Sequence, residues 1–232
     1  MAREKAKRRD LHQSVVVIGM GRFGSSLALE LMRNGHEVLG VDTDEKLVQQ
    51  LAQDLTQTVK ADTTDESALI ELGISEFDSA VVAIGADIEA SILTTSLLLQ
   101  LGIENVWAKA NSKSHGRILR QLGAHHVVFP EYDMGVRVAH QVSGESLEYV
   151  PIDKDFVLVK TYLPDILDGK ALGEAKVRAT YGVTIVATAS ADGGFQIALP
   201  DTVLKAGDQV VVAGPKGPLD EFCQFVYTEP NK

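Results

Sequence analysis

The sequence predicts an α/β protein with a doubly wound parallel sheet, a crossover helix and a small α+β lobe after it. Short apolar runs alternate with helical segments over the first 130 residues, as repeated βα units require. A glycine motif separates the first run from the first helix, where a nucleotide-binding fold turns. From residue 147 onward the pattern becomes strand-rich.

The boundaries of the first domain follow from these repeats. Strands are expected at 15–18, 37–41, 58–61, 79–84, 105–108 and 126–129. Helices are expected at 25–34, 45–54, 66–72, 88–101 and 114–122, several of them ending on glycine, which readily adopts a left-handed conformation. Most of the strand runs are apolar on both faces, as a parallel sheet covered by helices requires. The arrangement is Rossmann-like.

The remaining chain divides into shorter parts. Residues 1–13 form a basic tail, 14–130 the nucleotide-binding domain, 131–146 the crossover helix and 147–230 the C-terminal lobe. Within that lobe we expect an antiparallel pair at 149–152 and 156–163, a helix at 172–181, a hairpin from 183–189 to 195–199, a strand at 208–214 and a helix at 219–226.

The glycine motif carries the strongest functional signal. Gly19 permits a tight turn, Gly21 lets the backbone approach a phosphate, and Gly24 lets the helix pack closely on the strand. Asp42 ends the second strand 18 positions after Gly24, where a carboxylate can accept hydrogen bonds from ribose hydroxyls. The motif therefore predicts a bound dinucleotide or mononucleotide, with phosphates at the helix N-terminus. The alternative is a glycine turn kept only for packing.

Further candidates follow from the rule that ligands bind at the carboxyl ends of parallel strands. The expected cofactor-binding residues are Gly19, Met20, Gly21, Arg22, Phe23, Gly24, Asp42, Thr43, Asp62, Thr63, Ile84, Gly85, Lys109, Asn111, His115 and Glu131. The guanidinium of Arg22 suits a terminal or γ-phosphate better than a bare pyrophosphate.

Four of these residues have alternative interpretations. Arg22 and Lys109 are either phosphate cations or surface charges. Glu131 either balances Arg22, holds a cation beside a phosphate, or is an acid favoured by the start of its helix. His115 either touches the nucleotide or is a solvated histidine. His125 and His126 do not form a metal site, because neighbours on a strand point to opposite faces.

Composition excludes several classes of protein. The 232 residues are 45% hydrophobic and carry a net charge of −10, which argues against a nucleic-acid binder. Residues 1–10 are the local exception, with five basic and two acidic side chains that either contact an anionic membrane or partner or are solvated. Cys223 is the only cysteine, so no intrachain disulfide forms and a cytoplasmic location is expected. No apolar run is long enough to span a bilayer, and no signal peptide is recognisable.

Catalytic motifs are missing from the sequence. It has no HExxH, CxxC or Walker motif and no recognisable nucleophile–His–acid grouping, so a ligand-sensing module is favoured over an enzyme. Two alternatives stay open. One is a small NAD-dependent oxidoreductase or an NAD(H)-sensing regulator; the other is an interaction scaffold with a vestigial nucleotide site.

Five segments together resemble the regulators of potassium conductance (RCK, or KTN, proteins), in particular the cytosolic regulatory subunits of Ktr-type bacterial potassium uptake systems. These segments are residues 19–24, 40–42, 83–85, 107–109 and 130–139, and the C-terminal stretch 204–214 is similar as well. The likeness covers nearly the whole chain, and the Arg22-containing loop and residues 130–139 are its specific parts.

The resemblance implies a non-enzymatic, nucleotide-gated subunit. ATP would activate and ADP would inactivate transport through a change in the shape of a homo-octameric ring, a tetramer of dimers. That ring would dock on a membrane-embedded potassium-translocating subunit at the inner face of the cell membrane. Asp42 would hold ribose, Asp62 and Thr63 would line the adenosine pocket, and Arg22 would contact the γ-phosphate. Glu131 would reach a neighbour's phosphates, with a cation between them, and NAD(H) is an alternative cofactor.

Overall fold

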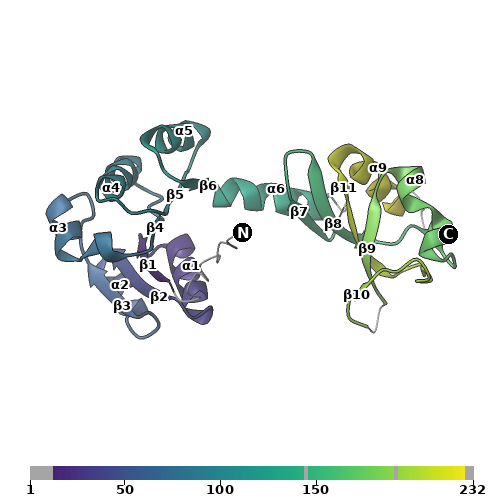
Figure 1. Ribbon diagram of the computed structural model, residues 1–232, viewed down its shortest axis with the longest axis horizontal. Helices are drawn as coiled ribbons and strands as arrows, with labels where there is room; N and C mark the ends of the chain where they lie inside the picture. The colour runs from purple at the N-terminus through teal and green to yellow at the C-terminus, as the bar shows by residue number, and fades with distance from the viewer. Residues whose placement is uncertain (1–12, 144–145, 191–192, 228–232) are drawn as a thin grey trace, which may run out of the picture. The chain divides into compact units, whose positions relative to one another are not determined.

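The computed structural model describes residues 13–143, 146–190 and 193–227, and the chain forms two compact units that divide between Glu131 and Tyr132. The predicted basic tail lies almost wholly outside the described residues. Within these ranges no helix is both long and apolar enough to cross a membrane. Each unit has its own sheet (Figure 1). Buried hydrophobic side chains form a separate core in each unit.

The first unit contains the predicted parallel sheet of six strands. The strands lie in the order β3-β2-β1-β4-β5-β6, so the order reverses between β1 and β4. Their bounds are β1 Ser14–Ile18, β2 Glu37–Asp42, β3 Gln57–Lys60, β4 Ser79–Val82, β5 Val106–Lys109 and β6 His126–Val128. All five pairings are parallel, which confirms the doubly wound α/β prediction. The glycine motif follows β1, at the position of the reversal.

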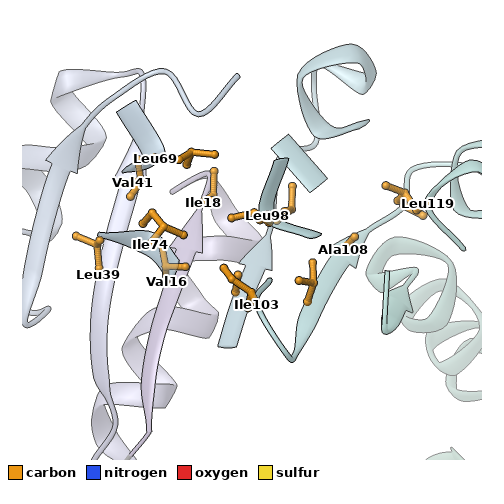
Figure 2. Close-up of a cluster of buried hydrophobic side chains, with 14 residues drawn as sticks. Val16, Ile18, Leu39, Val41, Leu69, Ile74, Leu98, Ile103, Ala108 and Leu119 are labelled. Carbon is orange, nitrogen blue, oxygen red and sulfur yellow. The ribbon is translucent and has the colours of Figure 1, made fainter. Parts of the chain in front are cut away.

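Helices cover both faces of this sheet. The helices are α1 Arg22–Arg33, α2 Glu45–Leu51, α3 Glu66–Glu71, α4 Ile88–Gln100 and α5 Lys113–Leu122, with a short 3-10 helix η1 at Ile74–Glu76. Alternate residues of each strand point to opposite faces. Val15 and Val17 of β1 therefore pack with α1 and α2, whereas Val16 and Ile18 pack with α3 and α4 (Figure 2).

The helix ends are specified locally. Asp44, Asp65, Asp87 and Ser112 are N-caps whose side chains accept a backbone N–H of the first turn. The glycines predicted to follow helices adopt positive φ angles, for example 104° at Gly123, as a left-handed helix end requires. Helix α1 begins at Arg22, earlier than the predicted 25, because Gly21 serves as its N-cap.

The second unit is the predicted α+β lobe with an antiparallel sheet in the order β10-β9-β11-β8-β7. Its elements are α6 Pro130–Val142 (which begins in the first unit), β7 Glu148–Pro151, β8 Phe156–Tyr162, η2 Asp165–Leu167, α7 Leu172–Ala175, α8 Val177–Tyr181, β9 Thr184–Ala189, β10 Gln196–Ile197, β11 Gln209–Pro215 and α9 Lys216–Tyr227. The expected pairings of β7 with β8 and of β9 with β10 are confirmed. The core packs Tyr149, Val159, Val212 and Phe222 together.

Two details of the second unit differ from the prediction. The single helix expected at 172–181 is broken at Lys176, whose φ of 47° is incompatible with a continuous right-handed helix. The last helix begins at Lys216 rather than 219. The predicted turn of the β9–β10 hairpin falls partly outside the described residues.

Candidate nucleotide-binding site

The glycine loop is tightly folded between β1 and α1. Gly19 has a φ of 95° and donates its N–H to Val41 O at 2.8 Å, so the loop is tied to the end of β2. A Cβ added to Gly24 would lie 1.8 Å from Gly19 O, whereas one added to Gly21 would meet no atom within 4 Å. Gly19 and Gly24 therefore permit the turn and the close packing of helix on strand, and Gly21 faces open space.

Asp42 joins the loop to the end of β2. Its Oδ2 accepts the Met20 N–H at 2.6 Å and its Oδ1 accepts the Asp44 N–H at 2.8 Å. Met20 is 1% exposed and packs in the core. A carboxylate oxygen has more than one acceptor position, so Asp42 retains capacity for ribose hydroxyls beside these backbone contacts. No sequence pattern predicts the Met20 contact, because its donor is a backbone N–H that almost any residue would supply.

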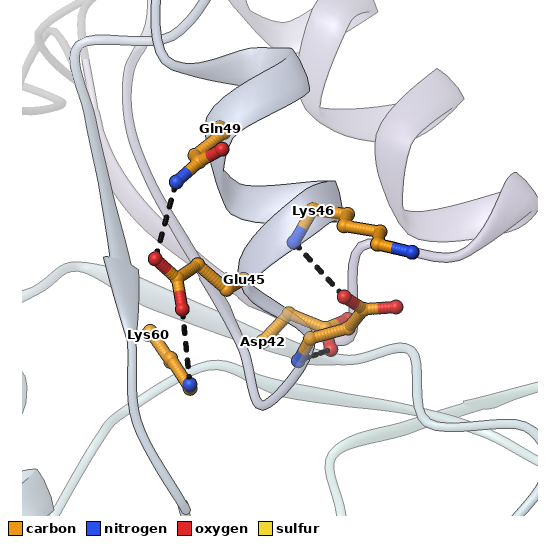
Figure 3. A network of polar contacts seen from close by, with 6 residues as sticks. Asp42, Glu45, Lys46, Gln49 and Lys60 are labelled. Carbon is orange, nitrogen blue, oxygen red and sulfur yellow. Dashed lines mark hydrogen bonds and ion pairs between the residues drawn. The ribbon is translucent and has the colours of Figure 1, made fainter.

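A polar network continues from Asp42 into α2 (Figure 3). Glu45 accepts from Gln49 Nε2 at 3.1 Å and pairs with Lys60 Nζ at 3.3 Å, and Asp44 caps the helix by accepting Lys46 N–H at 2.9 Å. Both members of the Lys60–Glu45 pair are exposed, so the pair contributes little to stability. Thr43, next to Asp42, is exposed at this same edge.

The residues after β3 take different positions. Asp62 is exposed, and hydrogen bonds from the Thr64 hydroxyl and N–H hold the pKa of its carboxyl below its usual value. Thr63 is 5% exposed, and its hydroxyl is hydrogen-bonded to that of Thr94 at 2.9 Å. Asp62 is thus accessible to a ligand, whereas the Thr63 side chain faces α4.

The loops after β4 and β5 are joined to each other. The Asn111 side-chain amide donates to Gly85 O. Ile84 and Gly85 are half-buried, and Ile84 N lies beside Gly19, since a Cβ on that glycine would be 3.0 Å away. The structure therefore brings the strand ends of β1, β4 and β5 together, as the prediction required.

Lys109 and Glu131 form an ion pair at this edge. Lys109 Nζ lies 2.6 Å from Glu131 Oε1, with side-chain exposures of 9% and 68% respectively. The Lys109 hydrogen bond, and secondarily the charges of Lys109 and Arg22, hold the pKa of Glu131 below its usual value. The expectation that Lys109 could be a surface charge is wrong, because the residue is buried. The direct partner of Glu131 is Lys109, not Arg22.

Arg22 and Phe23 open helix α1. Arg22 is exposed, and Phe23 is half-buried with its ring centroid 5.7 Å from Lys109 Nζ. Gly21 precedes them as N-cap and has no side chain to satisfy the first-turn N–H groups. A hollow of about 390 Å³ lies beside this loop, lined by Gly21, Arg22 and residues of α1 and α2. Cationic and N–H groups therefore converge where phosphates are expected.

His115 is buried at 2% exposure, so its interpretation as a solvated histidine is wrong. Its Nδ1 accepts the Asn111 N–H at 3.4 Å, Nε2 has no partner among the described residues, and desolvation lowers its pKa. His115 thus supports the Asn111 loop from inside the fold. In the part of the chain that the structure describes, no three His, Cys, Asp or Glu side chains are grouped to hold a metal ion.

Comparisons with known proteins identify the family of the chain. Residues 15–130 match the TrkA-N domain and residues 156–226 match the TrkA-C domain. The Ktr system potassium uptake protein A of Bacillus subtilis (strain 168) is 39% identical over 212 residues, which are 91% of this chain and 96% of that protein. The protein of the same name from Vibrio alginolyticus is 36% identical over 206 residues, 88% of this chain and 93% of that protein.

A solved structure of the GsuK channel bound to NAD has the same fold. It matches with a TM-score of 0.64 and 18% identity over 96% of this chain and 41% of that chain, so this chain spans less than half of the channel protein. The two-domain match and the two full-length relatives show the family. The chain belongs to the TrkA family, with a TrkA-N and a TrkA-C domain, alongside the Ktr system potassium uptake proteins.

Proposed function

We propose that this chain is a regulatory subunit of a potassium uptake system, switched by an adenine nucleotide bound in the first unit. The family membership supports the role in potassium uptake. The observation that supports a nucleotide site is the glycine loop, where Gly21 has open space beside it and Arg22 is exposed at the helix N-terminus. A phosphate chain in this place would meet backbone N–H groups and a guanidinium.

The proposed ligand is ATP or ADP. Asp42 accepts the ribose hydroxyls and Arg22 contacts the γ-phosphate. Asp62 lies on the adenosine side, and Thr63 contributes there through its backbone, because its hydroxyl is hydrogen-bonded to Thr94. The loops that contain Ile84, Gly85 and Asn111 lie on the side of the nucleotide opposite to Asp42. Only ATP has a γ-phosphate, so the Arg22 contact is made with ATP and not with ADP. A conformation in which Arg22 reaches the γ-phosphate therefore binds ATP more tightly than ADP, and a two-state switch requires such a difference in affinity. ATP then favours the active state and ADP the inactive one.

A cation belongs to this proposal as well. The carboxylate of Glu131 is 68% exposed and carries a lowered pKa, so it is ionised and accessible at neutral pH. Oxygen ligands from a carboxylate and from phosphates are what Mg²⁺ and Ca²⁺ prefer. We infer that Glu131 contributes one ligand and the nucleotide phosphates the others, across an interface between two copies of the chain.

The assembly is proposed as a homo-octameric ring, a tetramer of dimers, on a membrane-embedded potassium-translocating subunit. The chain itself then lies in the cytoplasm and reaches the membrane through its partner. The acidic net charge of −10 supports a protein partner over nucleic acid. Turnover of a substrate is not part of the proposal.

Equilibrium titration tests this function. Trp107 is the only tryptophan of the chain and lies on β5, two residues before Lys109, so its emission can follow binding. ATP and ADP are each titrated into the purified full chain, with NADH as the competing ligand, and the assembly's hydrodynamic radius is measured in each state. Saturable ATP and ADP binding with different radii supports the proposal. Binding of NADH alone, or steady oxidation of NADH with a small substrate, refutes it in favour of an NAD(H) sensor or oxidoreductase.

A further inference from the structure

We propose that Glu131 is an internal competitor for the nucleotide phosphates: it occupies the ammonium of Lys109 in the empty site, and an arriving phosphate must displace it. This inference rests on the proposed nucleotide site and adds a determinant of its affinity. It concerns the chain's own ion pair, so it applies before any cation is bound.

The position of Lys109 is the first step. The residue ends β5, is 7% exposed, and its Nζ lies close to both the glycine loop and the loop after β4. The Phe23 ring centroid is 5.7 Å from Nζ, and a Cβ added to Gly85 would come within 3.2 Å of it. The ammonium is therefore held by its surroundings at the edge where phosphates are expected, with little freedom to turn into solvent.

The unequal burial of the two partners is the second step. Only 9% of the Lys109 side chain is exposed, against 68% for Glu131. A buried ammonium left without an anion is costly, whereas an exposed carboxylate regains water when it leaves. Lys109 can therefore exchange the Glu131 carboxylate for another anion, whereas separation of the pair with no replacement anion is costly. A phosphate oxygen is such an anion, and it binds Lys by the same charge-assisted hydrogen bond.

The location of Glu131 is the third step. It is the second residue of α6, directly after the loop that follows β6, and β6 is the parallel neighbour of β5. Glu131 therefore contacts Lys109 from beside the end of the neighbouring strand, and the sheet does not have to rearrange for this contact. The pKa of Glu131 is lowered first by the Lys109 hydrogen bond and to a smaller extent by the charge of Arg22, in keeping with the 2.6 Å contact between Lys109 Nζ and Glu131 Oε1.

The test is the affinity of Glu131→Gln for ATP and ADP, measured by calorimetry on the full chain in EDTA, so that no divalent cation takes part. Removing the competing charge is expected to lower the Kd of ATP and of ADP by about 3- to 10-fold. The exposure of Glu131 keeps the expected change this small. Adenosine, which has no phosphate, is expected to bind equally to both proteins. Glu30→Gln is the matched control, because Glu30 forms an exposed ion pair with Arg33 at 2.9 Å near the far end of α1.

A double variant identifies the cation involved. With Lys109→Met present, Glu131→Gln is expected to give no further gain, since the ammonium for which it competes is gone. Wild-type protein that binds ATP while Glu131→Gln binds it equally or more weakly in EDTA overturns the competition and leaves the proposed function standing. An equal gain for adenosine also overturns it. Wild-type protein that binds no nucleotide refutes the proposed function itself.

Discussion

Replacing Gly24 by alanine tests whether the glycine loop depends on close contact between helix and strand. A Cβ at this position would lie 1.8 Å from Gly19 O and 3.0 Å from Gly19 C, both backbone atoms that cannot rotate away. Gly24→Ala must therefore push α1 away from the loop. Gly21→Ala is the matched control, because Gly21 has φ −65° and ψ −173° and open space around it.

The size of the effect follows from two opposing contributions. Overpacking against backbone costs about 1–3 kcal/mol or more, and alanine regains up to about 1 kcal/mol of helix propensity. The 1.8 Å contact places Gly24→Ala at the upper end of that cost, so we expect a net loss of about 2 kcal/mol in the free energy of unfolding, equivalent to roughly 4–8 °C in Tm. Gly21→Ala is expected to keep or slightly raise Tm, because it lowers the entropy of the unfolded chain.

Thermal unfolding followed by Trp107 fluorescence measures the Tm of each variant. Trp107 is a suitable probe because it belongs to the first unit and stacks on His126 with ring centroids 3.9 Å apart. The same two variants are then titrated with ATP. Gly21→Ala is expected to lose about tenfold or more in affinity while remaining folded, because its methyl group occupies the place of a phosphate. Equal melting temperatures for Gly24→Ala and Gly21→Ala would refute the packing argument.

Three further predictions concern single positions. Asp42→Ala should weaken ATP and ADP by the same factor in calorimetry, since both carry the ribose; unequal losses would contradict its role. Gly116→Ala should lower Tm in a thermal melt, because its Cβ would lie 2.3 Å from Phe129 Cζ, and an unchanged Tm would disprove that contact. Asp78 has a lowered pKa because it accepts hydrogen bonds from Ser14, so it stabilises the fold above about pH 4 and loses this as pH falls through the lowered pKa. Asp78→Asn should flatten the acid limb of the stability curve measured by urea unfolding, and parallel curves would contradict this.

Local patterns made most of the first unit predictable. Apolar strand runs and glycines after the helices define six strands and the five helices between them, and each strand lies within two residues of its expected ends. The two ends of the glycine motif were equally predictable, because Gly19 and Gly24 meet backbone at distances that exclude a side chain. Periodicity alone could not reveal the break at Lys176, since a left-handed residue other than glycine leaves no trace in the apolar pattern.

The partners within the site were harder to predict. The Asp42 contact uses a backbone N–H of Met20, which any residue would supply, and the Thr63 hydroxyl turns to Thr94 on a helix far away in sequence. Charge alone suggested that Glu131 balances Arg22. Its actual partner, Lys109, is set by the pairing of β5 with β6, which places the two strand ends side by side. The pairing of β5 with β6 therefore determines that Glu131 forms its ion pair with Lys109 rather than with Arg22.

The difference between ATP and ADP affinity in wild-type protein and in Arg22→Ala tests the central claim most directly. Calorimetry on the full chain is expected to show that Arg22→Ala loses about 1–3 kcal/mol more for ATP than for ADP, because only ATP presents a γ-phosphate to the guanidinium. An equal loss for the two nucleotides, or wild-type protein that binds neither, would contradict the account.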